Sequence, residues 1–139
     1  MTATYLDSSV LLRIVLREPD PLPDWRQIER VIVSELVEIE CLRTLDRLRL
    51  TRTLADDELA QARAAVLRLL SGASVVPLQS AVLRRAAEPF PTPLGTLDAL
   101  HLATALAWRA ASRQELALAT HDLALARAGR SYAMGVIGA

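Results

Sequence analysis

The order of apolar segments along the chain predicts an α/β sandwich built on a parallel sheet. Short apolar runs bounded by turn residues alternate with longer segments of helical periodicity, and there are no internal repeats or low-complexity tracts. The chain has 139 residues, which is enough for one substantial core, so we expect a single domain over residues 1–139. Ligands of such sheets bind beyond the carboxyl ends of the strands.

The predicted strands are short and apolar, and the second is a run of β-branched residues. They cover residues 3–6, 31–33, 74–78, 116–120 and 131–137. Ser34 follows the second strand and is a suitable N-cap for the next helix.

The predicted helices fill the intervals between the strands. They cover residues 10–17, 35–49, 56–70, 80–88, 96–112 and 123–128. Asp56, Asp57 and Glu58 place negative charge at the positive end of the third helix, and Gly72 follows its end. Prolines predict loops at residues 19–23 and 89–95.

The composition excludes several classes of function. Every basic residue is Arg, so neither a Walker-type phosphate-binding loop nor Schiff-base catalysis by Lys is available. Cys41 is the single cysteine, which rules out an internal disulfide and a multi-thiolate zinc site and favours a small buried hydrophobe. The formal net charge is zero, so bulk charge does not favour coating of nucleic acid, although local basic patches are not excluded.

No part of the sequence predicts a membrane segment. No apolar stretch approaches the roughly 20 residues of a membrane span, and the N-terminus lacks the basic and apolar pattern of a leader. We therefore expect a cytoplasmic protein without a membrane partner.

Four carboxylates occupy positions where a soluble protein rarely places charge. Asp7 and Asp122 each follow a short apolar run, Glu40 interrupts the apolar face of its helix, and Asp98 lies in a helix that is apolar nearly all round. Unpaired buried carboxylates are costly and must be offset by cations, hydrogen bonds or protons. If the fold brings them together, a divalent metal ion is the simplest way to offset their charge.

Ordinary structural roles compete with this interpretation. Asp7 and Asp122 are also suitable N-caps, and Asp98 is a favourable first-turn acid. Glu40 fits such a role less well, because its neighbours one turn away on either side face the core. A site made of carboxylates suits Mg²⁺ or Mn²⁺ rather than zinc, and its chemistry is the activation of water and the neutralisation of a phosphodiester's developing charge.

Several segments of the chain resemble the PIN-domain ribonucleases, most closely the VapC-type toxins of bacterial toxin–antitoxin pairs. The resemblance spans almost the whole chain, and all four acids fall in the family's order. It rests on residues 5–9, Ser34 with Glu40 and residues 42–43, residues 97–105, and residues 120–122. His121 departs from the pattern, because the family often has Tyr, Phe or Asn beside the fourth acid, and we interpret it as peripheral.

The resemblance implies a three-layer sandwich with a short, mostly parallel central sheet flanked by helices. It also implies that Asp7 and Asp98 are the principal ligands of Mg²⁺ or Mn²⁺, and that Glu40 and Asp122 complete the acidic, catalytic cluster. Supporting hydroxyls would come from Ser9 and Thr120. The implied protein is an endoribonuclease toxin that cleaves single-stranded or looped RNA, forms a homodimer and is blocked by a cognate antitoxin.

Basic and imidazole side chains are secondary candidates. His101 lies one turn beyond Asp98 and is a candidate ligand or base, but we favour a supporting role because the acids already supply a hard-cation site. The candidates for contact with RNA phosphates are Arg13, Arg17, Arg43 and Arg47.

The main alternative function is a catalytically silent PIN-like module that only binds a partner. A receiver-type domain is disfavoured because it needs a Lys. A haloacid-dehalogenase-like phosphatase would have an Asp where this chain has Ser9.

Overall fold

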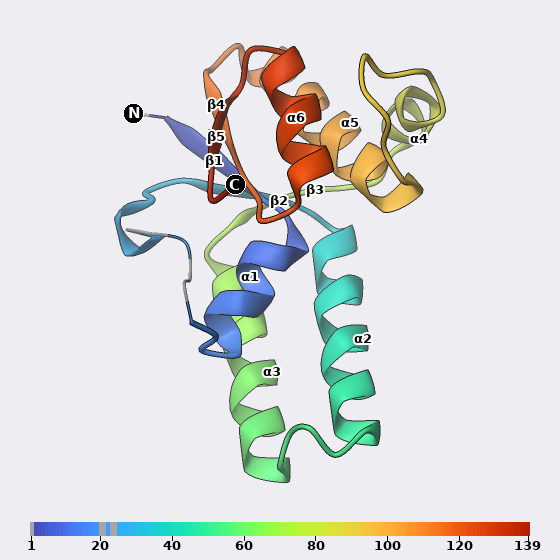
Figure 1. Cartoon of the computed structure of the whole chain (residues 1–139). Coiled ribbons are helices and arrows are strands. Elements are labelled where there is room, and N and C mark those ends of the chain that lie inside the picture. The colour runs from blue at the N-terminus through green and yellow to red at the C-terminus, as the bar shows by residue number, and fades with distance from the viewer. Residues whose placement is uncertain (1, 20–21, 23–24) are drawn as a thin grey trace.

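A parallel five-stranded sheet with helices on both faces forms the part of the chain that the computed structural model describes, residues 2–19, 22 and 25–139 (Figure 1). The strand order is β3-β2-β1-β4-β5, and every neighbouring pair is parallel. The strands are β1 (Ala3–Leu6), β2 (Val31–Ser34), β3 (Ser74–Val76), β4 (Leu116–Ala119) and β5 (Gly135–Ile137). The predicted α/β class is confirmed.

The strand order reverses at β1, which lies in the middle of the sheet. The chain moves outward from β1 to β2 and β3 on one side, then returns to place β4 on the other side of β1. Leu6 is in register with Ala119, and the Asp7 backbone N–H donates to the Ala119 carbonyl at 3.2 Å. The carboxyl ends of β1 and β4 therefore lie side by side at the switch point, where sheets of this kind bind ligands.

The helices divide between the two faces of the sheet (Figure 1). On one face lie α1 (Ser8–Val15), α2 (Leu36–Leu50) and α3 (Asp56–Ser71); on the other lie α4 (Ser80–Ala86), α5 (Thr96–Ser112) and α6 (Leu123–Ser131). The alternation of strand side chains produces this division: Leu6 packs into the core beneath α1 and α2, while Tyr5 packs into the core beneath α5 and α6. The result is the expected three-layer sandwich.

The α2 and α3 helices form an antiparallel pair that projects beyond the sheet (Figure 1). Val37, Cys41 and Leu45 are buried at four-residue spacing on α2, and they share a core with Ala62 and Val66 of α3. Burial raises the pKa of the Cys41 thiol to about 12, and the charges of nearby carboxylates add to this effect. Cys41 is therefore a small buried hydrophobe, as its sequence context predicts.

Element boundaries differ from the predictions in a few places. The α1 helix begins at Ser8 rather than residue 10, because Asp7 caps it. Ser34 is the last residue of β2 and not an N-cap; its hydroxyl accepts from the Leu36 N–H, and Glu35 occupies the cap position. A short 3₁₀ helix at Trp25–Gln27 was not predicted.

The predicted final strand began too early. Residues up to Ser131 belong to α6, and β5 starts only at Gly135. The preceding helix was predicted to end at residue 128, but it continues through Gly129, where an added Cβ would meet the Leu118 side chain at 2.6 Å. The glycine therefore lets α6 approach β4 closely.

Two further expectations concern loops and membranes. Most of the proline-rich loop at 19–23 lies outside the described residues, whereas Pro19 is an exposed bend. Within the part of the chain that is described, no helix combines the length and apolarity that crossing a membrane requires.

Candidate metal site

Asp7 follows β1 and is anchored by three hydrogen bonds. Its carboxylate is 4% exposed; Oδ1 accepts from the Ser9 hydroxyl at 2.6 Å and from the Val10 N–H at 3.3 Å. Oδ2 accepts from the Thr120 hydroxyl at 2.6 Å. Asp7 is thus both the N-cap of α1 and a carboxylate at the switch point, so the two interpretations of this position do not exclude each other.

The loop after β4 is connected to Asp7 through the same hydroxyls. The Thr120 hydroxyl accepts from the Asp122 N–H at 3.0 Å, and the Ser9 hydroxyl accepts from the His121 N–H at 3.1 Å. Asp122 caps α6, since its Oδ1 accepts from the Leu125 N–H at 2.8 Å. The His121 ring donates from Nδ1 to the Gly138 carbonyl at 3.0 Å, and its buried Nε2 has no hydrogen-bond partner among the described residues.

Glu40 lies in α2 and contacts a buried histidine. Its Oε1 is 2.6 Å from Nε2 of His101, and 16% of the Glu40 side chain remains exposed. On the other side of the ring, Nδ1 of His101 is 2.7 Å from the Tyr5 hydroxyl. His101 is 2% exposed, so this chain of contacts is almost sealed from solvent at its centre.

Asp98 occupies the first turn of α5 and has acidic surroundings. The pKa of the Asp98 carboxyl is raised to about 6, chiefly by burial and then by the negative charges of Asp122 and Asp7 and a hydrogen bond with the Asp122 side chain. The interaction with His101 lowers the pKa of Asp98. The fold has therefore brought Asp7, Asp98 and Asp122 within electrostatic reach of one another.

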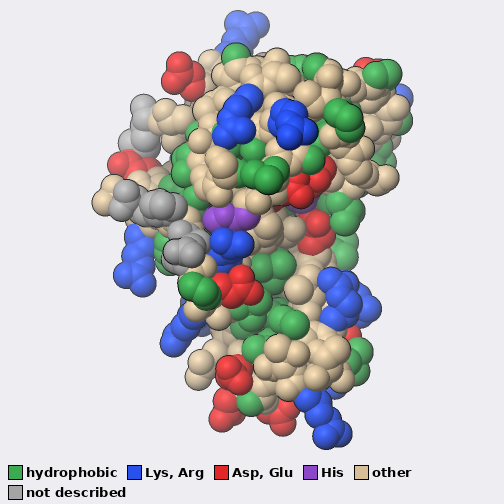
Figure 2. Space-filling model, viewed as in Figure 1, with side chains coloured by type: hydrophobic (Ala, Val, Ile, Leu, Met, Phe, Trp, Pro, Cys, Tyr) green, Lys and Arg blue, Asp and Glu red, His purple; other side chains and the backbone are tan. Residues whose placement is uncertain are grey.

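The four predicted acids come from separate parts of the chain: they follow β1 and β4 or lie in α2 and α5, in both helical layers. The charges of Asp7 and Asp122 act on Asp98. Glu40 is connected to the helix of Asp98 through its contact with His101. In Figure 2, acidic and histidine side chains reach the surface at the waist between the two layers. This part of the surface is therefore where the edge of the sheet meets both helical layers.

Oxygen ligands at this junction fit a hard divalent cation. Carboxylate and hydroxyl oxygens are the donors that Mg²⁺ and Mn²⁺ prefer. Burial is the largest cause of the raised pKa of Asp98, and the charges of Asp122 and Asp7 add to it. Within the described ranges, no group of three or more Asp, Glu, His or Cys side chains is already arranged to hold a metal ion.

The predicted RNA-contact arginines have acidic or hydroxyl neighbours. Arg13 lies 3.7 Å from Glu18, Arg43 donates to Asp46 at 3.2 Å, and Arg47 donates to the Thr44 hydroxyl at 3.1 Å. The Arg43 and Arg47 side chains are exposed on α2, the helix that also carries Glu40.

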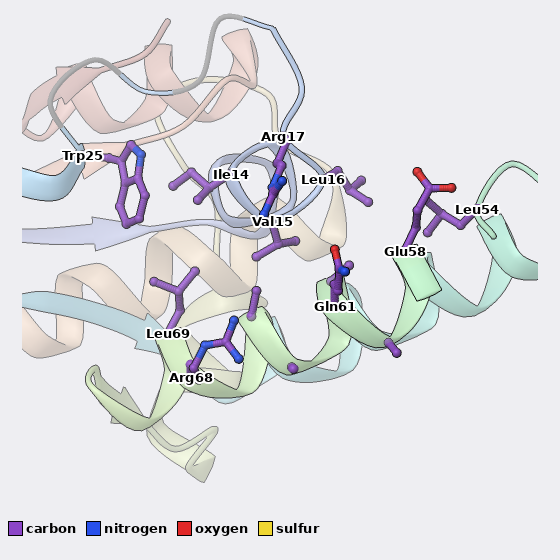
Figure 3. Close-up of a pocket in the computed structure, with 14 residues that line it drawn as sticks. Ile14, Val15, Leu16, Arg17, Trp25, Leu54, Glu58, Gln61, Arg68 and Leu69 are labelled. Atoms are coloured by element: carbon purple, nitrogen blue, oxygen red, sulfur yellow. The ribbon is translucent and has the colours of Figure 1, made fainter. Parts of the chain in front are cut away.

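A separate groove lies between α1 and α3, and none of the four acids lines it (Figure 3). Its volume is about 920 Å³, and its walls combine Val15 and Leu69 with Arg17, Glu58 and Arg68.

Tyr5 is the site neighbour that sequence reasoning missed. It is buried in β1, and burial raises the pKa of its hydroxyl well above the ordinary value, with a further contribution from the charge of Asp7. A tyrosine in an otherwise aliphatic strand was the available signal, because a buried phenol needs a hydrogen-bond partner.

A parallel α/β sandwich with carboxylates gathered at its switch point defines a class of domains suited to hard-cation chemistry on phosphate esters. Residues 4–131 match the model of the PIN domain family, and this chain belongs to that family. Ribonuclease VapC46 of Mycobacterium tuberculosis (strain ATCC 25618 / H37Rv) is 36% identical over 107 residues, which cover 76% of this chain and 75% of the relative.

Solved structures share the fold at low sequence identity. VapBC2 from Rickettsia felis, bound to a DNA fragment from their promoter, gives a TM-score of 0.64 at 14% identity over 97% of each chain. FitAB bound to a DNA fragment gives 0.68 at 17% identity, over 96% of this chain and 92% of the other.

Proposed function

We propose that this PIN-domain protein is a Mg²⁺- or Mn²⁺-dependent endoribonuclease and the toxin of a toxin–antitoxin pair. The observation that carries the proposal is the buried Asp7 carboxylate at the switch point of the sheet, which the hydroxyls of Ser9 and Thr120 orient. Asp98 and Asp122 lie within electrostatic reach of it. The ribonuclease relative, similar over three quarters of its length, supports RNA as the substrate.

In this proposal the four acids have two kinds of role in binding the metal ion. Asp7 and Asp98 are the principal ligands, and Glu40 and Asp122 complete the site. A Mg²⁺ or Mn²⁺ ion held by these acids would supply activation of water and neutralisation of the charge that develops on the phosphodiester. The hydroxyls of Ser9 and Thr120 hold the Asp7 carboxylate in a fixed orientation, so that ligand does not have to be ordered when the ion binds.

The proposed partners are RNA, a cognate antitoxin and a second copy of the chain, in the cytoplasm. The antitoxin is supported by the likeness of fold to VapBC2, which was solved with promoter DNA. For RNA phosphates, Arg43 and Arg47 are the better placed candidates, because they are exposed on α2, the helix that carries Glu40.

The direct test is cleavage of a single-stranded RNA by the purified protein with Mn²⁺, with Mg²⁺ and with a chelator. We expect cleavage only with the metal, and a loss of at least about 100-fold in Asp7→Asn and Asp98→Asn, as for removal of an essential charge at a reacting centre. Asp57→Asn is the matched control, because that acid is exposed on α3 and should keep full activity. Unchanged cleavage in both site variants would refute the proposal.

A second candidate function is a catalytically silent PIN-like binding module. It is favoured by one observation: among the described residues, the acids are not already arranged as a metal cluster. Melting curves separate the two functions, since a cation that binds only the folded state raises stability by about 2.7 kcal/mol at 100 times its Kd. No shift with millimolar Mg²⁺ or Mn²⁺ would support the silent module.

A further inference from the structure

We propose that His101 is a positioning residue, which accepts a hydrogen bond from Tyr5 and donates one to Glu40, and so holds the Glu40 carboxylate against the helix that carries Asp98. This inference rests on the proposed function, because it assigns a purpose to the orientation of a metal ligand. The three residues lie in different elements, β1, α2 and α5, and contact one another at 2.7 and 2.6 Å.

The direction of the two hydrogen bonds follows from their partners. A carboxylate oxygen can only accept, so Nε2 of His101 carries the proton in its contact with Glu40. In the neutral ring, Nδ1 is then an acceptor, and the Tyr5 hydroxyl donates to it. The pKa of Tyr5 is raised by burial, which keeps a proton on the phenol for this purpose. In this tautomer each of the two contacts holds one proton.

The ring itself is fixed by its surroundings. His101 is 2% exposed, and it meets the Tyr5 ring edge-on, with centroids 5.9 Å apart and an interplanar angle of 72°. A residue held in this way presents its Nε2 proton from one direction only. Glu40 must then orient toward α5 to accept that proton.

The contact also bridges the two helical layers. Glu40 belongs to α2 on one face of the sheet, while His101 belongs to α5 on the other. Asp98 precedes His101 by three residues, so the two side chains share a face of α5. Because only Oε1 of Glu40 is engaged by His101, the second oxygen can still bind a cation. The hydrogen bond therefore sets the separation between two proposed ligands.

Two substitutions at this position distinguish positioning from packing. In His101→Gln the side-chain amide can still donate from roughly the place of Nε2, whereas His101→Leu fills the space without a donor. We expect His101→Leu to weaken Mn²⁺ affinity at least about tenfold, as is usual when a partner that orients a ligand is lost. His101→Gln should recover most of that loss. Calorimetric titration with Mn²⁺ measures both variants without reference to activity.

The control variant is Leu102→Ala, which creates a cavity in the same buried helix without touching Glu40. It should lower the melting temperature and leave Mn²⁺ affinity unchanged. If His101→Leu behaves like Leu102→Ala, the inference is wrong while the proposed function stands. If the wild-type protein binds no Mn²⁺ at all, the proposed function fails and the inference fails with it.

A measurement on the metal-free wild-type protein keeps the inference testable if His101→Leu does not fold. Nitrogen-15 NMR of the imidazole reports which ring nitrogen carries the proton. We expect a proton on Nε2 and none on Nδ1, because the Glu40 carboxylate can only accept and the Tyr5 hydroxyl donates to Nδ1. A proton on Nδ1 in the wild-type protein would overturn the inference.

Discussion

Two carboxylates at one edge of the sheet have opposite environments. Asp7, at the junction of β1 and β4, is almost fully buried, yet it accepts hydrogen bonds from two hydroxyls and a backbone N–H. Asp98, in the first turn of α5, faces the charges of Asp122 and Asp7, and its pKa is raised to about 6, chiefly by burial. Anchoring by hydrogen bonds and a raised pKa thus belong to different carboxylates of one site. Asp7 has a fixed geometry, whereas Asp98 carries a charge that burial and its acidic neighbours disfavour and that a bound cation would offset.

The largest expected effect is destabilisation by Asp7→Asn. The amide places an N–H group where the carboxylate accepts a hydrogen bond, so one donor from Ser9, Val10 or Thr120 loses its partner. Without metal, we expect the free energy of unfolding to fall by about 2 kcal/mol, measured by urea denaturation. The exposed control Asp57→Asn should change it by only a few tenths of a kcal/mol. An Asp7→Asn protein as stable as the wild type would show that Asp7 is not anchored.

A smaller effect of opposite sign is expected for Asp98→Asn. The neutral amide removes repulsion from Asp122 and Asp7, so the metal-free protein should gain about 0.5–1 kcal/mol at neutral pH, a discounted value because the carboxyl is partly exposed. The same variant should lose the stabilisation that Mn²⁺ gives the wild type. Paired melting curves with and without Mn²⁺ measure both effects. Destabilisation without metal would mean that Asp98 is held like Asp7.

The smallest effect is the pH dependence of that gain. The folded-state pKa of Asp98, about 6, lies above its ordinary value of 3.8, so the folded protein holds more protons between these values. The unfavourable contribution of Asp98 to the free energy of unfolding of the metal-free protein therefore becomes smaller as pH falls from above 6 toward 4. The stability difference between Asp98→Asn and the wild type should shrink over the same range, while Mn²⁺ affinity of the wild type declines. A difference independent of pH would refute the shifted pKa.

Local patterns predicted most of the elements. The span of α5 matches its apolar run, and β1 and α3 agree within one residue, since capping acids, glycine and β-branched runs act over a few residues. The helix predicted at 123–128 ended too early, since α6 continues through Gly129, which permits close contact with Leu118. Nothing within a few residues of Gly129 records that contact.

The sequence by itself determined the alternation of strands and helices and the four positions at which a carboxylate is out of place. Only the tertiary structure decided which neighbour each acid has, because the partners lie far apart along the chain. Thr120 is 113 residues from Asp7, and His101 is 61 residues from Glu40. Periodicity assigns a side chain to a face of its helix or strand, whereas strand order and layer packing determine which faces meet. The hydrogen bonds that hold Asp7, the raised pKa of Asp98 and the contact between His101 and Glu40 all depend on strand order and layer packing.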